Sequence, residues 1–255
     1  MNKQWIKDVL FDWCCIVGAI ACGSLCDWYA WPLWWWIVGN RLHALVILGH
    51  DATHKLVSRN RILNYFLGSF VCFAPIFLGW KGYRTLHMKH HKFLGTNKDP
   101  ELDNKRKAGI MIENATTKNI VAQFIKDLFF LSLGDIKHLS TKKEKGDWTP
   151  IIIFHSILFI LGVLLSWKIL VIFYGGLLTS FIACARLRVW FEHVGTSKTH
   201  KIKASWWQKA LFLPHNAEYH HEHHEKPAVP YNKLKEIAEN ERKTICQIQQ
   251  ERTRS

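Results

Sequence analysis

Residues 148–185 read WTPIIIFHSILFILGVLLSWKILVIFYGGLLTSFIACA and contain one charged residue, Lys168. The uncharged run before it, Trp148–Trp167, has 20 residues, which is the length of helix that crosses a bilayer. Lys168 marks a very short turn, after which Ile169–Phe191 leads back. The stretch therefore predicts two adjacent membrane helices that run in opposite directions.

The overall composition agrees with a membrane protein. The 255 residues carry 34 Lys+Arg against 20 Asp+Glu, a formal charge of +14, and 49% of them are hydrophobic. The mean hydropathy is nevertheless only −0.04, so long apolar stretches alternate with very polar ones. A collagen-like, disordered or disulfide-scaffold chain is excluded. Nucleic acid is not an expected partner, because uncharged runs separate the basic clusters along the chain.

Two further spans are expected upstream of this pair. The first runs from about Val9 to Cys26 and the second from Pro32 to His54, with a tryptophan-rich turn between them that suits a membrane interface. Arg41 falls about halfway along the second span, so it either faces a polar interior or lies where the helix projects beyond the bilayer. Four crossings and the positive-inside rule place both termini in the cytoplasm.

The apolar run Ile62–Trp80 is expected not to cross. Its 19 residues are too few to cross twice, Pro75 interrupts the helix, and basic residues flank both ends. Both ends therefore belong in the cytoplasm, and the run is interpreted as re-entrant or interfacial. Farther along, Ile120–Leu133 is a candidate interfacial helix, and Asn232–Ser255 predicts a polar helical tail.

Histidines gather in three short boxes on the expected cytoplasmic side. They read HDATH at 50–54, HMKHH at 87–91 and HHEHH at 220–224. Positions i, i+3 and i+4 share one face of a helix, so the histidines of a box can point at one centre. Neutral imidazole binds iron and zinc well, and eight imidazoles are too many for one ion. The boxes predict a site for two metal ions, with a histidine-rich surface patch as the alternative.

The boxes and their neighbours resemble the integral-membrane fatty acid desaturase and hydroxylase family. The segment 49–54 looks like the family's first box, and 87–91 followed by Asp99-Pro100-Glu101 looks like the second. The segment 216–224, with Pro227, Val229, Pro230 and Tyr231 downstream, looks like the third, and 186–193 looks like the segment that supplies one more ligand. The resemblance covers about Asp8 to Leu234.

This resemblance implies an all-α fold, a four-span membrane helical bundle with a cytoplasmic helical cap that holds a histidine-rich di-metal site. Residues 1–234 would form the desaturase-like domain and 235–255 a polar cytoplasmic tail. The two ions would be iron, with zinc as a replacement in overexpressed protein. The family's nine histidine ligands fall on His50, His54, His87, His90, His91, His193, His220, His223 and His224.

Other residues near the boxes have less certain roles. In the family, the position of Asn216 holds a metal-bound water, and His221 occupies a variable place that does not bind metal. Asp51, Glu192 and Glu222 suit hydrogen bonds to ligating imidazoles, with surface salt bridges as the alternative. His43 lies seven residues before His50 and is a candidate for the substrate path. The histidines expected elsewhere are a satisfied buried His155 and the loop or interfacial residues His138, His200 and His215.

The expected chemistry is hydrogen removal from an unactivated methylene group. Side-chain acids and bases are insufficient for this, whereas a metal centre with O₂ and two electrons performs it in the family. The sequence has no haem-binding HPGG segment and no flavin motif, so a separate donor is implied, a ferredoxin or a cytochrome-b5-like protein attracted by the basic face.

Three functions are compatible with these motifs. The first is a desaturase of acyl lipids or fatty acyl chains. The second is a hydroxylase or ketolase of the same superfamily acting on a carotenoid, a sterol or an alkane, because one kind of centre serves both outcomes. The third is a non-catalytic membrane metal-binding protein.

Overall fold

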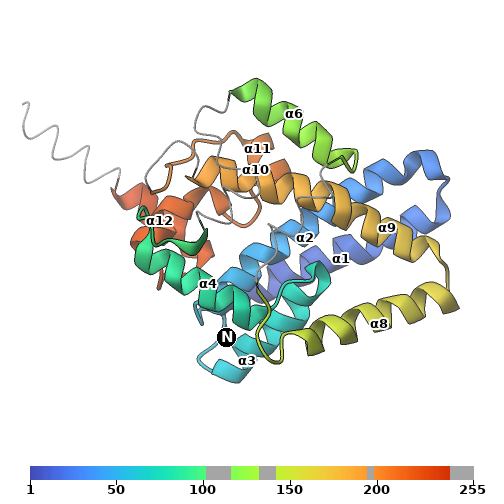
Figure 1. Ribbon diagram of the computed structural model, residues 1–255, viewed down its shortest axis with the longest axis horizontal. Helices are drawn as coiled ribbons and strands as arrows, with labels where there is room; N and C mark the ends of the chain where they lie inside the picture. Colours follow the sequence, from blue (N-terminus) through green and yellow to red (C-terminus); the bar gives the residue numbers. More distant parts are fainter. Residues whose placement is uncertain (102–115, 132–141, 194–197, 242–255) are drawn as a thin grey trace, which may run out of the picture.

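The computed structural model describes residues 1–101, 116–131, 142–193 and 198–241, and all regular structure in these ranges is helical (Figure 1). The predicted all-α class is confirmed. The helices are α1 Lys3–Leu25, η1 Trp28–Ala30, α2 Trp31–Thr53, α3 Arg61–Phe66, η2 Leu67–Phe73, η3 Ala74–Ile76, α4 Trp80–Phe93, α6 Thr117–Leu128, α8 Trp148–Leu164, α9 Lys168–Gly176, η5 Leu177–Phe181, α10 Ile182–His193, α11 Trp206–Phe212, η6 Ala217–Tyr219 and α12 His220–Glu225. Residues 231–241 form a last helix.

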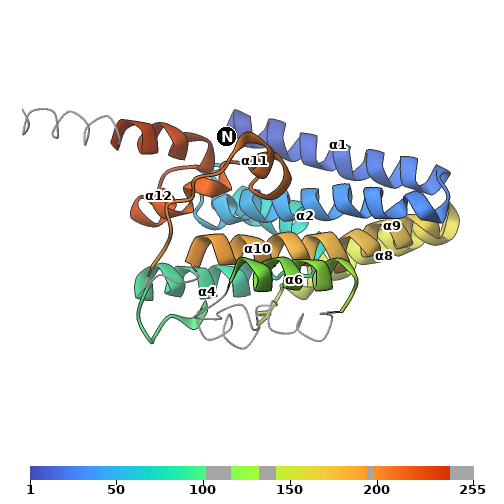
Figure 2. The same ribbon diagram turned by 90° about the horizontal axis from the view of Figure 1, so that it is seen from above.

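A layer of long helices forms the core. Helices α1 and α2 lie side by side, and α9, η5 and α10 continue one another alongside α2 (Figure 2). At Gly39 of α2, an added Cβ would lie 2.4 Å from the Phe181 nitrogen and 2.5 Å from the Gly176 oxygen. Only glycine allows the two backbones to approach this closely, and this contact fixes α2 against the helix that leads to His193.

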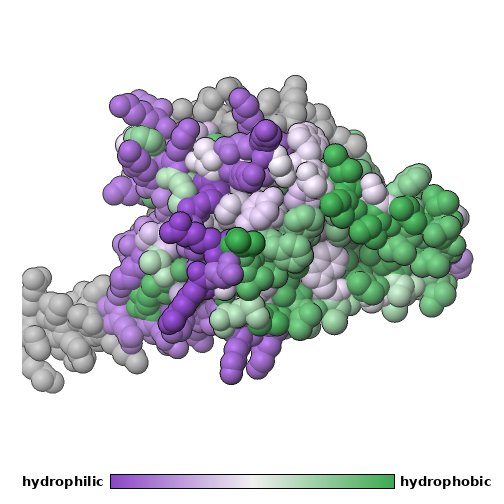
Figure 3. Space-filling model, turned by 90° about the horizontal axis from the view of Figure 1, so that it is seen from below, coloured by the Kyte–Doolittle hydropathy of each residue, from purple (hydrophilic) through white to green (hydrophobic). Residues whose placement is uncertain are grey.

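Among the described residues, two helices are long and apolar enough to cross a membrane, or three if the bent pair Arg61–Ile76 and Trp80–Phe93 counts as one span. The two are Lys3–Leu25 and the continuous helix Lys168–His193, while the apolar helix Trp148–Leu164 has 17 residues. Apolar residues gather at the end of the molecule where α8 and α9 lie, and hydrophilic ones at the opposite end (Figure 3). The protein is therefore a membrane protein. The expected four crossings would need two spans in addition to these two helices.

The run expected to be re-entrant is bent. The helical stretch Arg61–Ile76 meets α4 at 98°, which is the geometry of a broken span or of a re-entrant loop. Pro75 lies in η3. Phe77, the first residue after η3, has a left-handed φ of 55°. His155 of α8, expected to be buried and satisfied, is hydrogen-bonded to the Ala74 carbonyl at 3.1 Å and to the Tyr174 hydroxyl at 2.9 Å but is only half-buried.

Arg41 faces a polar interior. Its guanidinium lies 3.1 Å from an oxygen of Asp12, an α1 carboxylate with no exposed side-chain area. The pair bridges α1 and α2 inside the bundle and explains how the second expected span accommodates a charge.

Helix α6 combines an anchored face with an exposed apolar one. Asp127 forms a buried ion pair with Arg186 of α10 at 2.9 Å, while Val121, Ile125 and Phe129 are exposed. The interfacial helix expected over Ile120–Leu133 is present but runs from Thr117 to Leu128, and residues 129–131 form a turn. Residues 132–133 lie outside the described ranges, as do His138 and residues 242–255 of the expected tail.

Candidate metal centre

The three histidine boxes meet at one end of the bundle. The first box ends α2, the second lies on α4, the third forms α12, and His193 is the last residue of α10. The hydroxyl of Thr53 donates to the carbonyl of His50 at 2.5 Å inside the last turn of α2. The first and third boxes are more than 150 residues apart in the chain, yet the fold brings their imidazoles together.

The nine histidines form two neighbouring groups. Within each group the candidate ligand atoms all lie within 4.8 Å of one another. The first group comprises His50, His54, His87, His91 and His223, and the second comprises His90, His193, His220 and His224.

Each HxxHH box is divided between the two groups, which corrects the expectation that a box points at one centre. His87 and His91, at i and i+4, lie in the first group, and His90, at i+3, lies in the second. The third box has the reverse pattern, because His223 lies in the first group and the other two in the second. Adjacent helix positions differ by about 100°, so neighbouring side chains reach opposite groups.

The spacing of the Nε2 atoms is that of ligands around an ion. Nε2 of His87 lies 2.9 Å from Nε2 of His54 and 2.9 Å from Nε2 of His91. In the second group, Nε2 of His220 lies 3.0 Å from that of His193 and 2.9 Å from that of His224. Two nitrogens at about 2.1 Å from one ion, at right angles, are about 3 Å apart.

The Nδ1 atoms of several of these rings face outward to oxygen partners. Nδ1 of His90 lies 2.8 Å from Asp99 Oδ2, with both side chains buried. Nδ1 of His193 donates to the Lys198 carbonyl at 2.9 Å. Nδ1 of His220 lies 3.5 Å from Glu192, and Nδ1 of His87 lies 3.5 Å from Glu101. A hydrogen on Nδ1 leaves the Nε2 lone pair free for the centre of each group.

Sequence reasoning missed the roles of Asp99 and Glu101. The motif Asp-Pro-Glu was noticed after the second box, yet only Asp51, Glu192 and Glu222 were proposed as partners of imidazoles. The signal was available, because a carboxylate residue that follows a metal-binding helix within one short loop can fold back onto it.

The other three predicted neighbours have different surroundings. Asp51 is buried and accepts the backbone N–H of Tyr231 at 3.1 Å. Glu222 is buried and its Oε2 has no hydrogen-bond partner among the described residues. The Asn216 side chain donates to the Tyr231 carbonyl at 3.2 Å, beside a hollow that His50, His220 and His223 also line.

Burial favours the neutral form, which binds metal, in several of these imidazoles. It lowers the pKa of His91 to about 3, with the neighbouring His87 as the second cause. Burial also lowers the pKa of the ligand candidates His87, His220, His223 and His224.

Comparison with known proteins agrees with this site. The family model described as fatty acid desaturase matches residues 27–250. The chain belongs to this family. It is 25% identical over 246 residues to dihydrorhizobitoxine desaturase of Bradyrhizobium elkanii, a match that covers 85% of this chain and 69% of that protein.

Acyl-lipid desaturases are similar over shorter stretches. The sn-1 oleoyl-lipid 12-desaturase of Synechocystis is 37% identical over 107 residues, 40% of this chain and 28% of that protein. The ferredoxin-linked sn-2 acyl-lipid omega-3 desaturase of Helianthus annuus is 33% identical over 99 residues, 36% of this chain and 22% of that protein. As a member of the desaturase family, the chain is a membrane oxidoreductase. Its matches to these two acyl-lipid desaturases cover only about a quarter of their length.

His221 lies outside both metal-binding groups. Its Nδ1 is 2.8 Å from the Thr199 hydroxyl and its Nε2 is 3.3 Å from Glu225. His221→Ala is therefore expected to retain both metal ions and most activity, whereas His220→Ala loses at least one ion. Metal per protein, measured for the two variants side by side, tests this. A similar loss in both variants would contradict the assignment within this box.

His43 and His215 both lie largely away from solvent. His43 is buried on α2, and neither ring nitrogen has a hydrogen-bond partner among the described residues. His215, expected to be a loop or interfacial residue, is in a loop but nearly buried, with Nε2 2.7 Å from Asp12.

Proposed function

We propose that this protein is an O₂-dependent di-iron desaturase that introduces a double bond into a fatty acyl chain. The observation that carries the proposal is the pair of adjacent, buried histidine groups at the end of an apolar helical bundle. One ion would be held by His50, His54, His87, His91 and His223. The other would be held by His90, His193, His220 and His224, with a water at Asn216 completing the site.

The chemistry of the donor set fits iron. Nε2 of His50 and Nε2 of His90 are buried and have no hydrogen-bond partner among the described residues, although each lies within a cluster of imidazoles. Zinc accepts the same neutral nitrogens and would replace iron in overexpressed protein. All-nitrogen groups of this kind do not suit magnesium or calcium, which prefer oxygen.

The two iron ions, together with O₂, two electrons and two protons, would supply the oxidant that converts –CH2–CH2– to –CH=CH– with release of two water molecules. The chain's own residues orient and shield this site. Asp99, Glu101 and Glu192 hold imidazoles by Nδ1, and the burial of His90, His193 and His223 excludes water from the reacting face.

The electron donor would be a separate acidic protein, a ferredoxin or a cytochrome-b5-like protein. The name of the Helianthus annuus relative includes ferredoxin. Exposed lysines Lys89, Lys203 and Lys235 lie at the end of the molecule that holds the histidine groups. A net charge of +14 would speed the association with such a donor at low salt.

The four-crossing topology, with both termini and the histidine site in the cytoplasm, forms part of the proposal. It requires Arg59 and Lys89, exposed residues on either side of the bent segment, to face the same side of the membrane. Single cysteines at 59 and 89 should both react with an impermeant maleimide only when the cytoplasmic face is open. Labelling of the two positions from opposite faces would contradict the re-entrant segment.

The substrate class is tested by expression in a host that lacks desaturases. Lipid mass spectrometry should detect an acyl product that has lost two hydrogens, absent with the His223→Ala variant. A product that has gained oxygen would instead indicate a hydroxylase. Because a dihydrorhizobitoxine desaturase matches 85% of this chain, dihydrorhizobitoxine belongs in the substrate panel as a second candidate. No product from metal-loaded protein with any of these substrates would contradict the proposal.

A further inference from the structure

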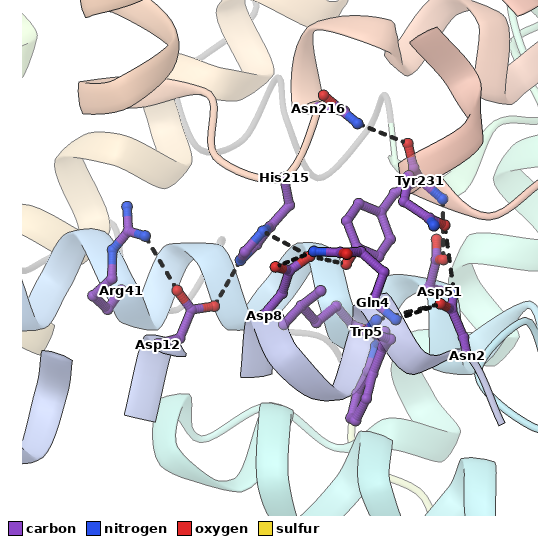
Figure 4. Close-up of polar contacts among 12 residues, drawn as sticks. Asn2, Gln4, Trp5, Asp8, Asp12, Arg41, Asp51, His215, Asn216 and Tyr231 are labelled. Atoms are coloured by element: carbon purple, nitrogen blue, oxygen red, sulfur yellow. Dashed lines mark hydrogen bonds and ion pairs between the residues drawn. The ribbon is translucent and has the colours of Figure 1, made fainter. Parts of the chain in front are cut away.

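Helix α1 contacts the chain on both sides of the third histidine box. Before the box, Nε2 of His215 lies 2.7 Å from Oδ2 of Asp12. After the box, the Tyr231 hydroxyl donates to Asp8, and the side chains of Asn232 and Asn2 are hydrogen-bonded at 3.3 Å. Figure 4 shows Asp8 and Asp12 of α1 pointing toward the two segments that carry His215 and Tyr231. The family match begins at residue 27, after α1 has ended at Leu25.

The segment before the box has a backbone that needs support. His215 and Asn216 have consecutive left-handed φ values of 53° and 59°, which are uncommon for residues other than glycine. Such conformations persist where the surroundings fix them. Here the His215 ring is held by Asp12, and the Asn216 amide is held by the carbonyl of Tyr231. Four residues later the chain reaches His220.

Asp12 is an unusual residue for its place. It has no exposed side-chain area, although it lies in α1, a helix that is apolar enough to cross a membrane. Its two oxygens are divided between Arg41 of α2 and His215. Apolar residues of similar size often give a buried site equal or greater stability than an ion pair, so stability alone does not account for this arrangement.

Tyr231 closes the second side. Burial, and then the hydrogen bond to Asp8, raise the pKa of Tyr231, so the hydroxyl remains protonated and donates to that carboxylate. The backbone N–H of Tyr231 donates at the same time to Asp51, the residue next to His50. The segment after the third box is therefore tied to α1 and to the first box together.

We propose that α1 is a positioning element for the third box, in which Asp12 and Asp8 hold the flanking segments so that the imidazoles of 220–224 divide correctly between the two metal-binding groups. This inference rests on the proposed metal site. Asp12, His215 and Tyr231 act through the box and not on the substrate.

The test compares Asp12→Asn and Tyr231→Phe in the full-length protein in lipid nanodiscs, with Asp27→Asn, two residues beyond the end of α1, as a control. The Tyr231 variant removes only a hydroxyl and therefore decides the question if the Asp12 variant fails to fold. Three measurements are made: the chelator concentration that removes half of the bound iron, the absorption spectrum of the cobalt(II)-loaded protein, and amide hydrogen exchange.

We expect Asp12→Asn and Tyr231→Phe to lose iron at chelator concentrations about 10-fold lower than the parent protein, as when an outer partner of a ligand is removed. The cobalt spectrum should change, and exchange should accelerate in 215–232 but not in α8. Asp27→Asn should match the parent protein.

Two results would overturn the inference: unchanged metal retention and cobalt spectrum in the folded variants, or equal acceleration of exchange in α8, which would indicate general destabilisation. A parent protein that binds no metal would contradict the proposed function instead. Hydrogen exchange in 215–232 would still test whether α1 holds the segments on either side of the third box.

Discussion

Replacing His223 by alanine is expected to remove one of two metal ions and to lower product formation by more than about 100-fold, beyond the usual cost of losing an outer partner. His223 lies in the first group and its Nε2 is 3.1 Å from that of His91. It is 2% exposed, so water does not replace the lost imidazole freely. His90→Ala should have the same effect through the second group.

Metal content by mass spectrometry and product formed per protein are the measurements. His221→Ala is the matched control, because it removes an imidazole from the same helix that lies outside both groups. Full activity of His223→Ala or His90→Ala would contradict the ligand assignment.

Asp99→Asn is expected to weaken metal binding at the second group by about 10–100-fold. Asp99 accepts from Nδ1 of His90 at 2.8 Å, and the carboxylate has no exposed area. The asparagine amide would turn a donor toward His90 and favour the tautomer with hydrogen on Nε2, the atom that faces the other histidines. The other oxygen, which accepts from the N–H of Glu101 at 2.9 Å, would keep its partner.

The measurement is competition with a chelator of known affinity, with melting temperature recorded in parallel. Glu241→Gln, which weakens only partly exposed pairs with Lys226 and Lys201, serves as the control. If Asp99→Asn holds both ions as tightly as the parent protein, the contact with His90 does not orient a ligand.

The helices could be predicted closely because their signals are local. The span expected from Val9 to Cys26 ends one residue after α1 but starts six residues later than α1 does. The span expected from Pro32 to His54 agrees with α2 to within one residue at each end. The three histidine boxes were equally readable, since the spacing i, i+3, i+4 has meaning only on a helix. The family match to residues 27–250 agrees with these motifs.

The distribution of the histidines between the two groups could not be read from the boxes. His90 and His91 are neighbours in the chain but lie in different groups, because the helix turns by about 100° per residue and α4 lies between the two. Only the positions of α2, α10 and α12 around α4 decide which side of the helix faces which partner.

The sequence by itself determined the helical class, the apolar spans and the identity of the histidines, since each depends on residues within a few turns of one another. The tertiary structure alone decided that Asp12 meets His215 and that Asp99 meets His90. The first of these contacts joins residues 203 positions apart, and no local periodicity records it. A carboxylate is stabilised inside an apolar bundle only by a partner that folding brings to it, so such pairs appear with the packing of the helices.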